Sequence, residues 1–91
     1  MSKTFLKDPD ATIDYVFDWS LYLDAISDTI ASATIIADIG ITVVSSEVVG
    51  ATVVVFLSGG TLNDRYKIVC RVTTVGGRID DRSLFVKIKE A

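Results

Sequence analysis

The fold class follows first from Ile13-Asp14-Tyr15-Val16-Phe17-Asp18-Trp19, where a large apolar residue occupies every second position. Successive side chains of a β-strand point to opposite faces, so this alternation predicts a half-buried strand with its aromatic face turned inward. We expect each of the four large side chains to contribute about 2 kcal/mol on burial. This strand therefore supplies a large share of a small hydrophobic core, with Trp19 as its largest member.

The same period of two recurs along the rest of the chain and stops at glycines and small polar residues. It predicts further strands, with a short one near residues 4–6 and others at residues 29–39, 41–45, 51–58, 66–75 and 84–88. Residues 51–58 are apolar on both faces, which indicates a central or covered strand. In the last strand, Lys87 and Lys89 are expected to point outward and protect a sheet edge.

The turns between these strands have their own sequence signals. Gly59-Gly60 and Gly76-Gly77 predict turns, and the second is expected to belong to a longer loop from Gly76 to Arg82. A further turn is expected to begin at Ser46-Glu47. Residues 20–28 fit neither the helical nor the strand period, so a loop or a single helical turn is expected there.

Two packed sheets can bury the apolar faces of about seven short strands, whereas one sheet cannot. The sequence therefore predicts an all-β fold, an antiparallel β-sandwich. Ninety-one residues allow one domain. We expect residues 1–12 to form an N-terminal arm with a turn at Asp8-Pro9-Asp10, and residues 13–91 to form the single sandwich domain.

Composition excludes several classes of partner. Twelve Asp and Glu against nine Lys and Arg give a net charge of −3, whereas nucleic-acid-binding modules usually carry a basic excess. The longest apolar stretch, residues 53–57, is too short to span a bilayer, and residues 1–7 lack the apolar region of a signal peptide. We expect no nucleic acid or membrane partner, and synthesis in the cytoplasm. A mean hydropathy of +0.46 implies either very complete burial or apolar surface covered by a partner.

The residue types argue against catalysis and metal binding. No histidine is present to activate the serines, and nucleophilic catalysis needs a base. The acidic pairs Asp14 with Asp18 and Asp80 with Asp81 are neighbours in sequence rather than carboxylates facing each other across a cleft. No loop has the regular spacing of oxygen ligands in a calcium site. We therefore expect no enzyme, no catalytic residue, no metal site and no cofactor.

Three other residues are assigned by their position in the alternation. Cys70 shares a face with Ile68 and Val72, which favours a buried thiol, and a lone cysteine cannot form an internal disulfide. Trp19, with Tyr15 and Phe17, could form a sugar-stacking platform, but their spacing of two favours the core. Tyr22 lies outside the pattern and is the better candidate for an exposed aromatic.

The run Leu57-Ser58-Gly59-Gly60-Thr61 and the strand that begins at Tyr66 resemble the E–F corner and F strand of immunoglobulin-like and fibronectin type III domains. In those folds a tyrosine near the start of the F strand bonds back to the corner through its hydroxyl. The resemblance implies this role for Tyr66, with backbone partners between Gly60 and Asn63. The immunoglobulin cysteine pair is absent, so only the sandwich architecture is implied.

A second resemblance covers Lys7 to Lys89. Six blocks resemble, in the same order, small structural proteins of tailed bacteriophages and prophages that are described as fibre–tail adaptor or head–tail neck components. The blocks are Lys7-Asp8-Pro9-Asp10, Asp14-Tyr15, Asp18-Trp19-Ser20, Asp28-Thr29-Ile30-Ala31-Ser32, Leu57-Ser58-Gly59-Gly60-Thr61 and the run from Thr73 to Ser83. The resemblance implies a non-enzymatic virion protein, present in several copies, that joins tail or neck proteins to a fibre or adjacent ring.

Partner contacts are expected at strand ends, where the loops of a sandwich are presented. The candidates are the loop residues Gly76, Gly77, Arg78, Asp80, Asp81 and Arg82, together with Tyr22. Paired charges of this kind set the geometry of a contact without a large apolar patch, although a plain solvated hairpin fits the same residues. An accessory binding module for a carbohydrate or host-surface ligand is the alternative function, and exposed aromatics flanking a groove would favour it.

Overall fold

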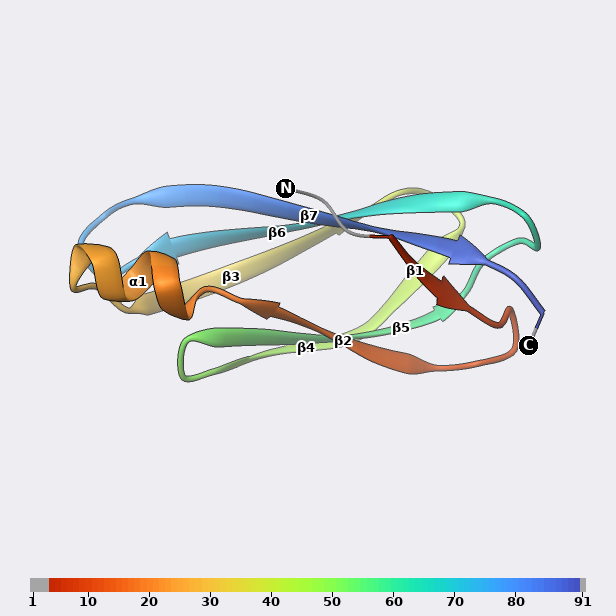
Figure 1. Ribbon diagram of the computed structural model, residues 1–91, viewed down its shortest axis with the longest axis horizontal. Coiled ribbons are helices and arrows are strands. Elements are labelled where there is room, and N and C mark those ends of the chain that lie inside the picture. The colour runs from red at the N-terminus through yellow and green to blue at the C-terminus, as the bar shows by residue number, and fades with distance from the viewer. Residues whose placement is uncertain (1–3, 91) are drawn as a thin grey trace.

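Two β-sheets packed face to face form the body of the computed structural model, which describes residues 4–90 (Figure 1). One sheet has the strand order β1-β7-β6-β3 and the other has the order β2-β5-β4. The elements are β1 (Thr4–Lys7), β2 (Ile13–Asp18), α1 (Ser20–Ile26), β3 (Ile30–Ala37), β4 (Ile41–Val49), β5 (Thr52–Gly59), β6 (Arg65–Thr74) and β7 (Ile79–Ile88). The all-β sandwich with seven strands in these residues confirms the predicted fold class.

The strand order from β2 to β7 follows that of strands B to G in an immunoglobulin-type sandwich, with β2-β5-β4 as B-E-D and β3-β6-β7 as C-F-G. The first strand departs from the constant-type arrangement, because β1 pairs in parallel with β7, from Thr4 opposite Phe85 to Lys7 opposite Ile88. Lys87 therefore lies inside the sheet, and the expectation that it protects a sheet edge is wrong. A relationship to immunoglobulin domains beyond this order stays a prediction.

The core lies between the inner faces of the two sheets. In β2, β5, β6 and β7 the buried side chains alternate with more exposed ones, as the period of two predicts. The buried cluster consists of Tyr15, Phe17, Trp19, Leu23, Ile41, Val53, Val55, Leu57, Tyr66, Ile68, Cys70, Val72, Leu84, Val86 and Ile88. Its members come from both sheets and from α1, so the three parts are stabilised together.

The segment after β2 forms the helix α1, which has about two turns and lies at one end of the sandwich (Figure 1). The prediction of a loop or a single turn is wrong, because tertiary contacts stabilise a helix too short to persist alone. Leu23 is buried in the core, and Tyr22 packs edge-to-face on Trp19 with ring centroids 5.7 Å apart. Tyr22 is therefore half-buried rather than the exposed aromatic that was expected.

The strand β4 is longer than the sequence indicates. It continues to Val49, and the turn falls at Gly50-Ala51 instead of beginning at Ser46-Glu47. A β-bulge between Val43 and Ser45 shifts the register and with it the alternation. Beyond the bulge, Ser46 and Glu47 stay paired with β5, so their polar character does not end the strand.

Tyr66 closes the corner between β5 and β6. Its hydroxyl accepts a hydrogen bond of 2.9 Å from the Thr61 amide, within the segment from Gly60 to Asn63 that the resemblance indicated. Its ring is buried beside Gly40 and Gly60, where an added Cβ would lie 2.9 Å and 3.4 Å from ring carbons of Tyr66. The conformation of the corner therefore depends on two features of Tyr66. Its ring packs closely against Gly40 and Gly60, and its hydroxyl accepts the hydrogen bond from Thr61.

Tyr66→Phe is expected to lower the free energy of unfolding by about 1 kcal/mol, because the Thr61 amide loses its acceptor while the ring stays in place. Urea unfolding followed by circular dichroism measures the change. Tyr22→Phe removes a hydroxyl from the half-buried ring on α1 and is the matched control. Equal stability of Tyr66→Phe and the wild type would show that the corner is held by other contacts.

Cys70 is fully buried on β6, and burial raises the pKa of its thiol above the ordinary value. A thiol that is buried and protonated reacts slowly, because the thiolate is the nucleophile. We expect the folded protein to react with a thiol reagent far more slowly than the protein denatured in urea, as followed by mass spectrometry. Labelling at similar rates in both states would contradict this placement of Cys70.

Candidate interaction surfaces

A pocket of about 210 Å³ lies at the side of the sandwich, where β1 leaves the first half of β7 uncovered, and a more open hollow of about 370 Å³ is lined by Arg71, Ile79, Asp80 and Asp81. The pocket beside β1 is lined by Phe5, Val16, Phe17, Asp18, Arg82, Ser83 and Leu84. Residues 4–90 contain no cluster of three or more histidine, cysteine or acidic side chains that could hold a metal ion. None of the helices in this part of the chain is long and apolar enough to cross a membrane.

The candidate loop from Gly76 to Arg82 is divided between two elements. Gly76, Gly77 and Arg78 lie in the turn between β6 and β7, whereas Ile79 to Arg82 belong to β7 and pair with β6. The expectation of one long loop is wrong, because cross-strand pairing stabilises this polar start of β7. Whether these residues contact a partner stays a prediction.

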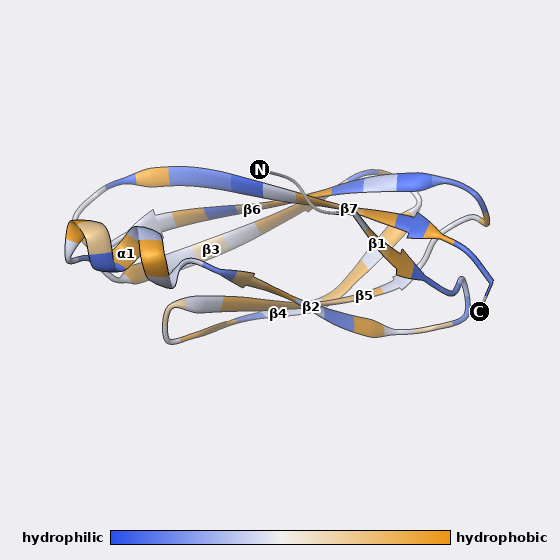
Figure 2. Cartoon of the chain, viewed as in Figure 1, coloured by the Kyte–Doolittle hydropathy of each residue, from blue (hydrophilic) through white to orange (hydrophobic). Residues whose placement is uncertain are grey.

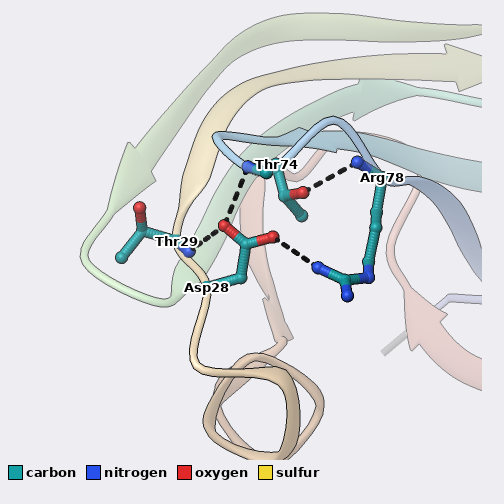
Figure 3. Close-up of polar contacts among 5 residues, drawn as sticks. Asp28, Thr29, Thr74 and Arg78 are labelled. Carbon is teal, nitrogen blue, oxygen red and sulfur yellow. Dashed lines mark hydrogen bonds and ion pairs between the residues drawn. The ribbon is translucent and has the colours of Figure 1, made fainter.

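Asp28 ties the turn after β6 to the start of β3 (Figure 3). Its carboxylate accepts hydrogen bonds from the amides of Thr29 at 2.8 Å and Gly76 at 3.1 Å, and lies 3.2 Å from the Arg78 guanidinium. The Arg78 amide in turn donates to the Thr74 hydroxyl at 3.0 Å. An added Cβ at Gly76 would lie 2.7 Å from the Asp28 carboxylate, so a larger residue there would displace this carboxylate from its partners. Arg78, a predicted contact residue, is thus already paired within the chain.

The Asp28 carboxylate predicts a pH dependence of stability. Hydrogen bonds, first from the Thr74 side chain and then from the Thr29 amide, lower the pKa of Asp28 below its ordinary value. Because the pKa is lower in the folded state, the stabilisation is present above the unfolded value and is lost as the pH falls through the folded value. Asp28→Asn is expected to have a lower Tm than the wild type at neutral pH, and the gap should close below about pH 4.

Thermal unfolding followed by circular dichroism from neutral pH to about pH 2.5 measures this gap. Asp24→Asn, which removes an exposed carboxylate from α1, separates the loss of the Asp28 contacts from the change in net charge. A Tm difference between Asp28→Asn and the wild type that stays constant over the whole range would contradict the assignment.

The other candidate charges also have partners inside the protein. Arg71 and Asp81 form a two-point ion pair, with nitrogen–oxygen distances of 2.8 Å and 3.0 Å, and both side chains are nearly half exposed. Arg82 donates to the Asp18 carbonyl oxygen at 2.6 Å, and its guanidinium carbon lies 4.4 Å from the centroid of the Trp19 ring. Arg82 therefore joins β7 to the end of β2 across the open side of the sandwich.

One buried charge was missed by the sequence reasoning. The Lys7 side chain is only 1% exposed, and its ammonium group donates to the carbonyl oxygens of Gly59 at 2.8 Å and Asp8 at 2.9 Å. Desolvation lowers the pKa of Lys7. The contact fastens β1 to the end of β5 in the opposite sheet, and no local sequence signal points to it.

The outer face of the β2-β5-β4 sheet carries exposed apolar side chains. Val16 on β2 is 52% exposed and Phe56 on β5 is 40% exposed, and Val54 lies between them in the register, opposite Val16. The sequence predicted a central or covered strand here; β5 is central, but Phe56 is left uncovered by residues 4–90. Figure 2 shows few strongly hydrophilic residues on β4 and β5. This face therefore offers adjacent apolar side chains from two strands to a partner.

Comparisons with known proteins give one family. No curated protein matches the chain. The family model described as "Podophage GP4 fiber-tail adaptor protein gp77" matches residues 7–87, which include every strand and the helix apart from the first residues of β1 and the last residue of β7. A match over nearly the whole sandwich confirms the resemblance to fibre–tail adaptors, and the chain belongs to the family of the podophage GP4 fibre-tail adaptor protein gp77.

Proposed function

We infer that this protein is a non-enzymatic subunit of the virion that joins tail or neck proteins to a fibre or an adjacent ring through direct protein–protein contacts. Membership in a fibre-tail adaptor family gives a structural adaptor role among phage tail and fibre proteins. The observation that supports direct protein–protein contacts is the uncovered apolar outer face of the β2-β5-β4 sheet.

Such a face is suited to bind another protein. The solvent-facing side of an antiparallel sheet is usually polar, whereas here Val16, Val54 and Phe56 form a contiguous apolar row across two strands. Burial of apolar surface contributes about 25 cal/mol per Å², so covering these side chains stabilises a complex. In addition, the two outer faces of a sandwich point in opposite directions, so one small subunit can contact two neighbours at once.

The aromatic residues do not favour the carbohydrate-binding alternative. Trp19 is fully buried, and Tyr22 packs on it. The exposed aromatics among residues 4–90 are Phe5 on β1 and Phe56 on β5, which belong to different sheets. We propose no sugar site, no nucleic acid or membrane contact and no cofactor. We also propose several copies in the particle, after synthesis in the cytoplasm of the bacterial host.

Deletion of the gene from its phage or prophage, followed by electron microscopy of the particles, tests this function. We expect particles without fibres or with an incomplete neck, and loss of infectivity, because the junction lacks its adaptor. Complementation with the wild type should restore both. Complementation with Val16→Ser/Phe56→Ser should fail, whereas Leu21→Ser, which changes a residue 83% exposed on α1, should succeed. Infectious, fibre-bearing particles in the absence of the protein would end the adaptor proposal.

A further inference from the structure

The charges of this chain are strongly segregated along the sequence. From Asp8 to Asp64 the chain contains nine carboxylates and no lysine or arginine, whereas seven of its nine basic residues follow, from Arg65 onward. The fold turns this segregation into two outer faces of different charge, because β2, β4 and β5 form one sheet while β6 and β7 form the centre of the other.

The outer face of β2-β5-β4, here called the acidic face, has the side chains that alternate with the buried ones. It carries Asp14, Val16 and Asp18 from β2, Val54 and Phe56 from β5, and Glu47 from β4, which lies opposite Val54. None of these three strands contains a lysine or arginine. The face is therefore an apolar centre with carboxylates at its rim. Its own strands supply no cation, and Arg82 of β7 approaches the rim at Asp18.

The outer face of β6 and β7, here called the basic face, carries Arg65, Lys67 and Arg71 from β6 and Phe85 and Lys87 from β7. Two carboxylates lie among these cations, namely Asp81 beside Arg71 and Asp38, which accepts a bond from the Lys67 amide. The guanidinium carbon of Arg65 lies 3.9 Å from the Phe85 ring centroid, so this face also offers an apolar surface next to its charges. Its net charge is positive.

The two faces match each other in spacing as well as in sign. On β2 the outward row reads Asp14, Val16, Asp18, and on β6 it reads Lys67, Val69, Arg71. In both rows the end charges lie four residues apart, about 13 Å in an extended strand, with a valine between them. The acidic and basic faces therefore carry opposite charges at equal spacing about an apolar centre. Two surfaces with this arrangement are electrostatically complementary.

We propose that the acidic face of one copy of this chain docks on the basic face of a second copy. The contact is heterologous: a two-fold pairing of acidic with acidic or basic with basic faces would set like charges against each other. A heterologous contact repeats from copy to copy and generates a closed ring or an open stack. The inference rests on the proposed function, since it names a second copy of the chain as one of the joined proteins.

The test is sedimentation velocity of the purified full-length protein over a range of concentrations at low and high salt. We expect association beyond the monomer at low salt, and a loss of about tenfold in association constant at high salt, because exposed charges are screened. A protein that stays monomeric at every concentration and salt would overturn the proposal. It would leave the adaptor function standing if deletion of the gene still gives fibreless particles.

Two neutralised variants test the heterologous geometry. Asp14→Asn/Glu47→Gln weakens only the acidic face, and Arg65→Gln/Lys67→Gln weakens only the basic face. Each alone is expected to associate about tenfold less tightly than the wild type, while their equimolar mixture, in which one native face of each kind remains, should form a one-to-one complex and stop there. Asp24→Asn, which changes the net charge on α1 and away from both faces, should associate like the wild type.

A face-to-face dimer gives a different pattern. The variant whose altered face lies outside the dimer contact would then associate as strongly as the wild type. Mixing the two variants would not restore the association of the other one. This pattern would overturn the proposal. Circular dichroism checks that each variant is folded. If a charge variant fails to fold, Val16→Ser replaces it on the acidic face and Phe85→Ser on the basic face. Unchanged association of these folded replacements would also overturn the proposal.

Discussion

Trp19→Ala is expected to lower the free energy of unfolding by about 3–5 kcal/mol, the largest loss from any single substitution proposed for this protein. Trp19 is fully buried where three parts of the fold meet: it follows β2 directly, packs against Tyr22 of α1 and lies under the Arg82 guanidinium of β7. The indole N–H lies near the Cys70 thiol, a weak acceptor, and has no hydrogen-bond partner within geometric limits among the described residues. The loss therefore reflects packing and the cavity that alanine leaves.

Small domains are stable by only about 5–15 kcal/mol, so Trp19→Ala is expected to leave a substantial unfolded fraction well below the wild-type Tm. Urea unfolding followed by circular dichroism gives the free energy without relying on tryptophan fluorescence. Leu21→Ala, on the exposed side of α1, is the matched control and should change stability by no more than about 0.5 kcal/mol. A loss of less than about 1 kcal/mol for Trp19→Ala would contradict its central place in the core.

Gly60→Ala is expected to cost about 2–4 kcal/mol, for two separate reasons. Gly60 has φ +98, a backbone conformation that L-residues rarely adopt. In addition, an added Cβ would lie 2.6 Å from Cδ1 and 2.7 Å from Cγ1 of Ile88. Ile88 is fully buried in the core cluster, so moving it aside would disturb the packing of its neighbours. The substitution therefore adds overpacking to backbone strain.

Gly77→Ala separates these two contributions. Gly77 has φ +91, close to that of Gly60, but an added Cβ would have no neighbour within 4 Å. It is expected to cost only the backbone strain, about 1–2 kcal/mol. Equal losses for Gly60→Ala and Gly77→Ala in urea unfolding would show that the contact with Ile88 does not limit the packing between the corner and β7.

The parts of the fold that the sequence predicted are those in which burial itself sets the pattern. In β2, β5 and β6 every second side chain is buried, so the period of two identifies the inward residues directly. Tyr66 could be assigned through its resemblance to a known corner. Its hydrogen bond with the Thr61 amide lies within the segment that this resemblance indicated.

The elements that were missed depend on contacts that no local window contains. The helix α1 forms because Leu23 and Tyr22 reach the core. The polar start of β7 is held in the sheet by cross-strand pairs such as Asp81 with Arg71. A bulge in β4 breaks the alternation and hides the second half of that strand. Each of these features is tertiary in origin, and periodicity cannot predict it.

The candidate surfaces show the same division. Sequence reasoning chose charged turn residues, and the structure pairs Arg78 with Asp28 and Arg82 with the Asp18 carbonyl inside the chain. The absence of basic residues between Asp8 and Asp64 was a visible signal. The sequence alone does not show that this segregation produces two faces of different charge. Only the strand order assigns the acidic strands to one outer face and the basic strands to the other.

Cryo-electron microscopy of intact virions, at a resolution that separates β-strands, tests the adaptor function most directly. The account predicts density for this two-sheet sandwich at the junction between the tail and the fibre, with the outer face of β2-β5-β4 covered by a neighbouring protein chain. A junction at which tail and fibre proteins contact each other without this sandwich, or a sandwich whose Val16 and Phe56 face solvent in the particle, would contradict it.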